Sequence, residues 1–169
     1  MGDDGALYVK PALADAIAAD LISHADIITP NQFELQRLSG IEITDQASTI
    51  AAAQLLRQKR GIGTVIATGV LDPATPDRIT AIAVDENGIW AASGHRTEAP
   101  ASGAGDSFSA LLIGHYLRHR NLSPALAAAV AGTSAIFAAT AAAGRDELAI
   151  IDSQEIWANL PAGKAIKIG

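Results

Sequence analysis

Two short apolar runs, set between segments with helical character, constrain the fold of this chain most. Residues 25–29 (Ala-Asp-Ile-Ile-Thr) and 64–67 (Thr-Val-Ile-Ala) have the length and the branched side chains of buried strands. Strands that alternate with helices along a chain normally form a parallel sheet whose faces the helices cover. We therefore expect an α/β fold with a mostly parallel sheet flanked by helices on both faces.

Local signals place the other elements. The segment from Pro11 to about His24 has Leu13, Ile17 and Leu21 at four-residue spacing, which predicts an amphipathic helix with these three on its apolar face. Capping residues predict a short helix over 30–38 with Gly40 past its end, followed by a longer helix that Thr44 or Asp45 caps and Gly61 ends. The Asn87-Gly88 pair predicts a hairpin of residues 79–84 and 89–92. After it we expect a helix that Gly103 opens, an alanine-rich helix capped at Ser123-Pro124, a strand over 148–151, and a last helix that Asp152 or Ser153 caps.

Composition narrows the class of protein. The 169 residues are enough for one core, so we expect a single domain over residues 1–169. A net charge of −6 with scattered Lys and Arg argues against a nucleic-acid partner. Thr and Ser residues interrupt the alanine-rich run 125–143, which favours a buried helix over a membrane span. The absence of cysteine and of a basic, apolar leader fits a cytoplasmic protein.

A glycine-rich turn that opens a helix is the main chemical signal. Residues 102–110 read Ser-Gly-Ala-Gly-Asp-Ser-Phe-Ser-Ala. The backbone N–H groups of Gly103, Ala104 and Gly105, with the positive end of the helix dipole, would form an anion hole. Asp106, in the first turn, could take a proton from a hydroxyl beside the bound anion, which points to phosphoryl transfer to an alcohol. The alternative is that Asp106 is only a first-turn acid that the dipole favours.

A second polar pair follows the first expected strand. Asn31 and Glu34 are three residues apart, so they share one helical face at a strand end, where α/β sheets collect ligands. Glu34 could hold Mg²⁺ through water, and Asn31 could donate to a phosphate oxygen. Alternatively, Asn31 caps its helix and Glu34 is the first-turn acid of that helix.

Four segments in this order resemble a known family. Residues 1–9, 29–35, 64–69 and 102–110 together are similar to the carboxyl-terminal half of a ribokinase-like kinase, most closely pyridoxal kinase. The resemblance covers the chain from Met1 to about Trp157. It implies transfer of the ATP γ-phosphoryl group to the 5′-hydroxymethyl group of pyridoxal, pyridoxine or pyridoxamine, with Asp106 as the base.

The same resemblance implies further site residues. Thr68 and Gly69 would contact ATP, His95 and Arg96 would cover the nucleotide from a mobile flap over 93–102, and Tyr8, with Gly103 and Asp106, would contact the vitamer. It also implies Mg²⁺ at Glu34, a monovalent cation, and a homodimer at full length. Without the resemblance, Thr68-Gly69 reads as a strand-to-loop turn, Arg96 as a solvated loop residue and Tyr8 as a packing aromatic.

The chain departs from the family pattern in length. Family members begin with a further half that supplies central strands and much of the vitamin pocket, so this chain is expected to leave a sheet edge exposed. The alternatives that remain are a hydroxymethylpyrimidine kinase, a sugar kinase of the same superfamily, and a non-catalytic module that binds nucleotide. An Asp at position 106 favours pyridoxal over hydroxymethylpyrimidine, for which Cys is common there.

Overall fold

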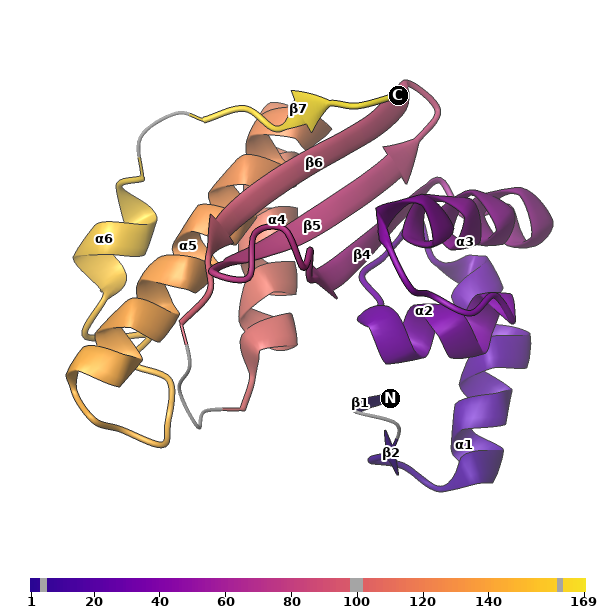
Figure 1. Ribbon diagram of the computed structural model, residues 1–169, viewed down its shortest axis with the longest axis horizontal. Helices are drawn as coiled ribbons and strands as arrows, with labels where there is room; N and C mark the ends of the chain where they lie inside the picture. The colour runs from indigo at the N-terminus through magenta and orange to yellow at the C-terminus, as the bar shows by residue number, and fades with distance from the viewer. Residues whose placement is uncertain (4–5, 98–101, 161–162) are drawn as a thin grey trace. The chain divides into compact units, whose positions relative to one another are not determined.

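The computed structural model describes residues 1–3, 6–97, 102–160 and 163–169 (Figure 1). These residues form two compact units. The first contains residues 1–72, 81–90 and 167–169, and the second contains residues 73–80 and 91–166. The strands fall into a two-stranded sheet and a five-stranded sheet with the order β3-β4-β5-β6-β7. The predicted α/β class, a central sheet with helices, is confirmed.

The core of the first unit lies around strand β4 (Thr64–Val70), which pairs in parallel with β3 (Ile27–Ile28). Helices α2 (Gln32–Ser39) and α3 (Gln46–Arg60) both pack against β4 and against each other. The buried side chains that form this core come from both helices, from β4 and from the following strand; they include Leu35, Ala52, Ala53, Leu56, Val65, Ala67, Ile82 and Val84.

The ends of α2 and α3 lie where the capping residues predicted them. Asp45 is the N-cap of α3, and its carboxylate accepts the Ser48 N–H at 2.7 Å. Gly40 and Gly61 end the two helices with φ of +73° and +68°, the left-handed conformation that favours glycine. The cap bond and the two glycines involve only neighbouring residues, so the sequence alone identifies these helix ends.

The amino-terminal helix has the predicted extent but not the predicted face. It begins as α1 (Pro11–Ala16), widens into the π-helical segment η1 (Ile17–Leu21) and tightens into the 3₁₀ turn η2 (Ile22–His24). Leu13 and Leu21 are 52% and 62% exposed, while Ala14 and Ile22 are buried. The inward positions Ala14, Ala18 and Ile22 keep the four-residue spacing, but they lie one residue after the predicted stripe, so small side chains face inward and the two leucines face outward.

A tight hairpin joins β5 (Arg78–Asp85) and β6 (Gly88–His95), as the Asn-Gly pair predicts. The carboxylate of Asp85 accepts the backbone N–H groups of Asn87 and Gly88 at 2.8 and 3.0 Å and so closes the turn. The last strand, β7 (Ile166–Lys167), lies beside β6 and was not predicted, since two residues carry no periodic signal. At the other end of the chain, β1 (Gly2–Asp3) pairs with β2 (Ala6–Leu7).

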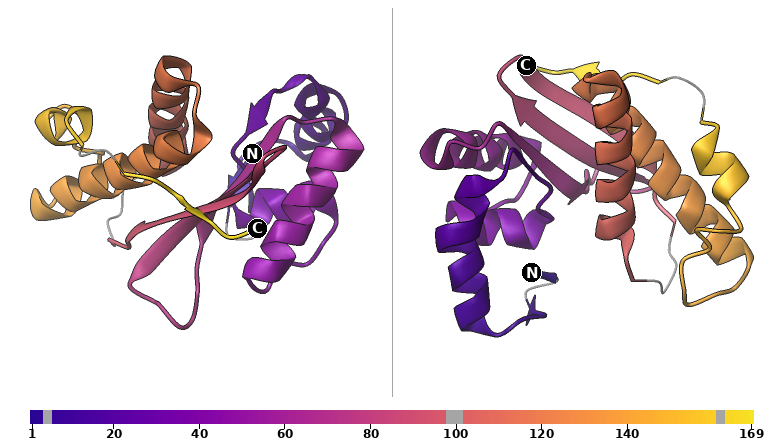
Figure 2. Two further views of the ribbon diagram at one scale, coloured as in Figure 1. Left: turned by 90° about the horizontal axis from the view of Figure 1, so that it is seen from above. Right: turned by 180° about the vertical axis from the view of Figure 1, so that it is seen from behind.

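Helix packing organises the second unit. Helix α4 (Ala104–His119) lies along the alanine-rich helix α5 (Leu122–Ala142), and α6 (Gln154–Ala158) packs on α5 (Figures 1 and 2). Gly132 lets the helices approach, because a methyl group there would come within 2.7 Å of Leu111 Cδ1. Among the described helices, α5 alone has the length and hydropathy of a membrane span, but it buries nine residues as a packed core helix does.

Two predictions about the second unit are wrong, and a third is right for a different bonding pattern. Residues 148–151 are a turn, not a strand, because the Ala149 N–H donates to the Thr140 hydroxyl at 3.0 Å instead of to a neighbouring strand. The cap of α5 is Asn121, and the Ser123 hydroxyl donates to the Ala165 carbonyl. Ser153 is the N-cap of α6 as predicted, but its hydroxyl donates backward to the Ala149 carbonyl at 2.6 Å.

Candidate functional site

No side chain of the described residues caps the start of α4. Gly103 is the N-cap residue, with φ of +99° and no side-chain cap. The first intrahelical bond in this turn runs from the Ser107 N–H to the Gly103 carbonyl at 3.0 Å. The N–H groups of Ala104, Gly105 and Asp106 therefore precede the helical hydrogen-bond ladder and are available to an anion.

The surroundings of this turn are open on one side and packed on the other. Ala104, Gly105 and Asp106 are exposed, and no atom of the described residues lies within 4 Å of the position that a Gly105 side chain would take. A side chain at Gly103 would instead come within 3.2 Å of Leu148 Cδ1. A ligand can thus approach the turn over Gly105, with the Asp106 carboxylate one residue away.

The start of α2 is built differently, as a complete capping box. The Asn31 side chain accepts the Glu34 N–H at 2.8 Å, and the Glu34 carboxylate accepts the Asn31 N–H at 3.1 Å. The Asn31 amide also donates to the Gly2 carbonyl at 2.8 Å, while Glu34 Oε1 accepts the Gly2 N–H at 3.3 Å and pairs with the Met1 amino group at 2.6 Å. These bonds tie the first strand to α2.

This geometry limits how Glu34 can hold a metal ion. Its side chain is 17% exposed, and both carboxylate oxygens already accept N–H groups. A direct ligand bond would compete with these contacts, whereas an outer contact through a bound water would not, and Mg²⁺ keeps much of its water shell. Within the described ranges, no three His, Asp or Glu side chains cluster with the spacing of a metal site.

Thr68 and Asn31 lie side by side at the carboxyl ends of β4 and β3. The two residues form an isolated parallel bridge, and the Thr68 N–H donates to the Pro30 carbonyl at 2.9 Å. The Thr68 hydroxyl reaches the same carbonyl at 3.4 Å. Gly69 follows with φ of +72° and open space around it. Strand carboxyl ends are where open α/β sheets bind ligands, so this corner is the second candidate region.

The remaining predicted residues, Tyr8, His95 and Arg96, are exposed. Tyr8 is 75% exposed and its N–H donates to the Met1 carbonyl at 3.1 Å. His95 is the last residue of β6 and is exposed, and the Arg96 N–H donates to the Asp77 carbonyl at 2.8 Å. The predicted flap over 93–102 is thus shorter at its start, since Ser93 to His95 are strand, and its residues 98–101 lie outside the described residues.

The structure therefore gathers the predicted residues into two groups. Asn31, Glu34 and Thr68 meet in the first unit, and Gly103 to Asp106 form one helical turn in the second. Each group consists of a helix start or a strand end with polar side chains. The sequence placed the two helix starts correctly, but it ended the second strand at Ala67, whereas β4 runs to Val70 and includes Thr68.

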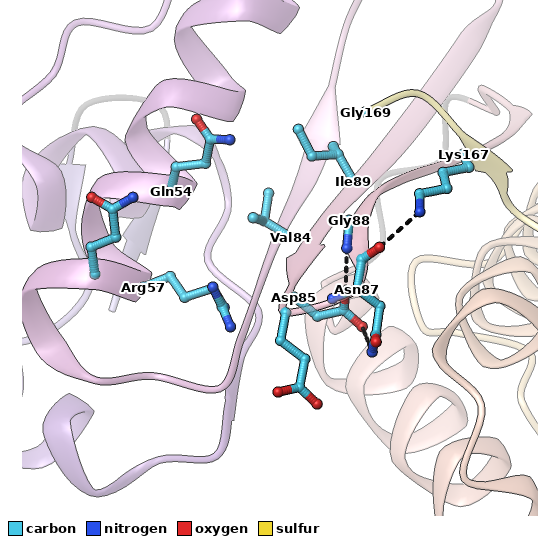
Figure 3. Close-up of a pocket in the computed structure, with 11 residues that line it drawn as sticks. Gln54, Arg57, Val84, Asp85, Asn87, Gly88, Ile89, Lys167 and Gly169 are labelled. Carbon is cyan, nitrogen blue, oxygen red and sulfur yellow. Dashed lines mark hydrogen bonds between the residues drawn. The ribbon is translucent and has the colours of Figure 1, made fainter.

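A pocket of about 300 Å³ in the first unit was not predicted from the sequence (Figure 3). Its walls come from α3, from the β5–β6 turn and from the last residues of the chain, and none of the predicted site residues lines it. Lys167 closes one side, since its ammonium group donates to the Asn87 carbonyl at 2.8 Å and lies 5.4 Å from the centre of the Trp90 ring. The only sequence signal for this region is the turn itself.

Known proteins resemble this chain in sequence. The family model described as phosphomethylpyrimidine kinase matches residues 1–150. Pyridoxal kinase PdxY of Leifsonia xyli is 37% identical over 153 residues, which are 90% of this chain and 54% of the relative. Pyridoxal kinase PdxY of Corynebacterium diphtheriae is 39% identical over 152 residues, 89% of this chain and 52% of the relative. The chain spans about half the length of the curated relatives it matches.

Solved structures agree with the sequence matches. Pyridoxal kinase from Entamoeba histolytica superposes with a TM-score of 0.87 at 25% identity, over 99% of this chain and 60% of that one. Pyridoxal kinase from Leishmania donovani in complex with ADP and pyridoxine gives a TM-score of 0.84 at 27% identity, over 98% and 58% of the two chains. The resemblance to pyridoxal kinases seen in the sequence is confirmed, and the chain belongs to the phosphomethylpyrimidine kinase family.

Proposed function

We propose that this chain is the catalytic part of an ATP-dependent kinase. The kinase phosphorylates the 5′-hydroxymethyl group of pyridoxal, pyridoxine or pyridoxamine. Its products are pyridoxal 5′-phosphate and the corresponding phosphates, and the reaction belongs to vitamin B6 salvage. The observation that carries the proposal is the start of α4. There, the cap residue is a glycine, the first N–H groups have no side-chain cap from the part of the chain that the structure describes, and an exposed carboxylate lies in the same turn.

The names of the relatives support the choice of substrate. The two curated relatives described above are pyridoxal kinases, and the Leishmania donovani enzyme is known in complexes with ADP and pyridoxine and with ADP and pyridoxamine. A nucleotide and a vitamer are therefore the two ligands that we expect this chain to handle. The match over half of each relative makes the activity of this chain the first point to test.

In the proposed reaction, Asp106 accepts the proton of the vitamer hydroxyl while that oxygen bonds to the γ-phosphorus of ATP. The bond from the γ-phosphorus to the bridging oxygen breaks, and ADP leaves with the electron pair. The N–H groups of Ala104, Gly105 and Asp106 stabilise the negative charge on the transferring oxygens. Because Asp106 is exposed at the helix start, both the hydroxyl and the phosphoryl group can reach it.

The other residues have binding roles in this proposal. Asn31, Thr68 and Gly69 hold the nucleotide at the strand ends, His95 and Arg96 contact it from the end of β6, and Tyr8, with Gly103 and Asp106, meets the vitamer. A divalent ion accompanies ATP and screens its phosphate charges, and we assign it to Mg²⁺. Glu34 would hold that ion through a water molecule, since its oxygens already accept backbone N–H groups. A monovalent cation, a cytoplasmic location and dimer formation at full length stay predictions.

The test is a substrate panel on the 169-residue chain. Calorimetry with ADP or a non-hydrolysable ATP analogue measures nucleotide binding, and the absorbance of pyridoxal 5′-phosphate measures turnover with ATP, Mg²⁺ and pyridoxal. We expect binding of nucleotide and phosphorylation of pyridoxal. The absence of both would contradict the proposal, and nucleotide binding without any turnover would instead support a non-catalytic nucleotide-binding module.

One observation favours a second candidate. The matching family model is described as phosphomethylpyrimidine kinase, so a hydroxymethylpyrimidine is the competing acceptor. Its hydroxymethyl group presents the same chemistry to Asp106. The panel therefore includes hydroxymethylpyrimidine and ribose, and a kcat/KM higher for either of them than for pyridoxal would overturn the assignment of the vitamer while leaving the kinase proposal intact.

A further inference from the structure

Two histidines stand one helical turn apart near the end of α4. His115 and His119 are at positions i and i+4, and the helix continues through His119. Residues with this spacing lie on the same side of a helix, with their Cβ atoms roughly 6 Å apart. His115 follows Asp106 by nine residues, which at 3.6 residues per turn places it about two and a half turns on, on the opposite side of α4. The pair is therefore separate from the proposed phosphoryl site.

Both imidazoles are available to a ligand. His119 is exposed and His115 is half-buried. Within the described part of the chain, neither ring takes part in a hydrogen bond or an ion pair. Helical side chains lean toward the amino terminus, so the His119 ring leans back over the turn that carries His115.

The neighbouring cations leave this side accessible. Arg120, just past the helix end, lies with its guanidinium group 6.0 Å from the centre of the Tyr116 ring, so it is drawn onto that aromatic face. Arg118 is exposed at the adjacent position. These positive charges weaken the attraction for a hard cation such as Mg²⁺, which prefers oxygen ligands, but they do not remove the nitrogen donors that a borderline ion uses.

We propose that His115 and His119 form a two-imidazole site for one borderline divalent transition ion, of the Zn²⁺, Ni²⁺ or Cu²⁺ class. The helix presents two imidazole side chains at a spacing that also occurs in metal-binding helices with paired histidines. Metal–nitrogen bonds of roughly 2.0–2.1 Å can be closed by two rings that converge from adjacent turns. Water molecules complete the coordination, since the described residues contain no cluster of three potential ligands.

A bound ion should stabilise the folded chain. Because the two rings converge only when α4 is helical, the ion binds the folded chain better than the unfolded chain and raises the melting temperature. A site of two ligands with open positions also follows the general affinity order, so Cu²⁺ should bind more tightly than Ni²⁺ or Zn²⁺.

The experiment is a titration of the untagged chain with Ni²⁺, Zn²⁺ and Cu²⁺, followed by calorimetry and by thermal melts in a non-coordinating buffer. We expect one ion per chain for each metal and a higher melting temperature. His119→Gln should weaken binding at least about tenfold, the lower bound seen even when a residue supporting a metal ligand is changed, and should abolish the rise in melting temperature.

Two controls make the outcome decisive. His24→Gln removes an exposed histidine elsewhere and should leave binding unchanged. Leu117→His combined with His119→Gln keeps two histidines on α4 but sets them two residues apart, on different sides of the helix. Leu117 is 54% exposed, so this change is compatible with the fold, and circular dichroism verifies it. Unchanged affinity in the spacing variant or in His119→Gln would overturn the proposal.

Discussion

At the start of α2, side chains of the chain itself bind the free backbone N–H groups, whereas at the start of α4 no side chain in the described ranges does so. Asn31 and Glu34 close a reciprocal capping box, and Glu34 also accepts bonds from the first two residues. Gly103 provides no cap, and Asp106 stays exposed. Both turns have an acid in the expected position, so the acid alone does not distinguish them.

This difference indicates which helix start binds an anion with the larger net gain in free energy. A capped helix start has already satisfied its donors, so a ligand must compete with side chains for them. An uncapped start exchanges only water for the anion. We therefore assign phosphoryl stabilisation to α4, and we assign to α2 a mainly structural role with an outer contact to the nucleotide and its ion.

The largest effect is expected for Asp106→Asn. The substitution keeps size and removes the base, and positioned proton transfer contributes about 10²–10⁴-fold to rate. We expect kcat with pyridoxal to fall by that range while nucleotide affinity in calorimetry stays the same. Asp146→Asn, an exposed aspartate in the loop after α5, is the matched control. A variant at position 106 that keeps more than about a third of kcat would exclude Asp106 as the essential base.

Gly103→Ala and Gly105→Ala sharpen the comparison within one turn. At Gly103, φ of +99° and the nearby Leu148 methyl make any side chain unfavourable, so we expect the free energy of unfolding to fall by about 1–2 kcal/mol. At Gly105, open space and helical geometry predict a gain of roughly 0.5–1 kcal/mol.

Denaturant unfolding measures both effects, and nucleotide calorimetry shows their consequence for binding. A more stable Gly105→Ala that binds ATP more weakly would indicate that the ligand approaches over Gly105. Unchanged ATP affinity in Gly105→Ala would place the phosphates elsewhere.

Glu34→Gln tests whether α2 has any role beyond capping. Loss of an acid at a helix start costs about 0.3–1 kcal/mol, so a slightly lower melting temperature is expected in any case. If Glu34 also holds the hydrated ion, the Mg²⁺ concentration for half-maximal rate rises, because the charge that orders the water shell is gone. A magnesium titration that superimposes on that of the parent would leave Glu34 with the structural role alone.

The smallest effect concerns the cap of α3. The Ser48 N–H and hydroxyl, which bond to the Asp45 carboxylate, lower the pKa of Asp45 below 3.8. A lowered folded-state pKa means that the cap contributes fully above pH 3.8 and is lost as the pH falls through the lowered value. Asp45→Asn keeps a capping side chain without this titration. The stability difference between the two proteins should therefore shrink or reverse on acidification, and parallel curves down to pH 3 would contradict this assignment.

Sequence reasoning succeeded where the determinants are local. Asp45, Gly40, Gly61 and Gly103 each mark a helix end through a cap or a positive φ, and each lies where it was predicted. It failed where a distant partner decides. The turn at Ala149 depends on the Thr140 hydroxyl nine residues earlier. Strand β7 depends on its pairing with β6, and two residues are too few to show a strand pattern in the sequence.

The candidate site shows the same limit in its chemistry. The sequence placed Asn31 and Glu34 at a strand end and left two interpretations open, a cap or a ligand. The structure shows the capping bonds, but these residue types suit both roles, so the pattern alone could not separate them. At α4 the sequence likewise left two interpretations of Asp106 open, a base beside an anion hole or a first-turn acid, and what the structure adds is a glycine cap with φ of +99° and an exposed carboxylate.

The route of the backbone between the two units has a consequence for dissecting the protein. The chain passes from one unit to the other at four peptide bonds, after Asp72, Thr80, Trp90 and Ile166, and two of these fall inside β5 and β6. No single cleavage can release either unit as an uninterrupted piece. Proteolytic cleavage of one connection would leave the two units joined by the other connections. Because each unit contains part of the β5–β6 hairpin, unfolding of one unit would also remove part of the two strands that continue into the other. Heat should accordingly produce one cooperative transition rather than two.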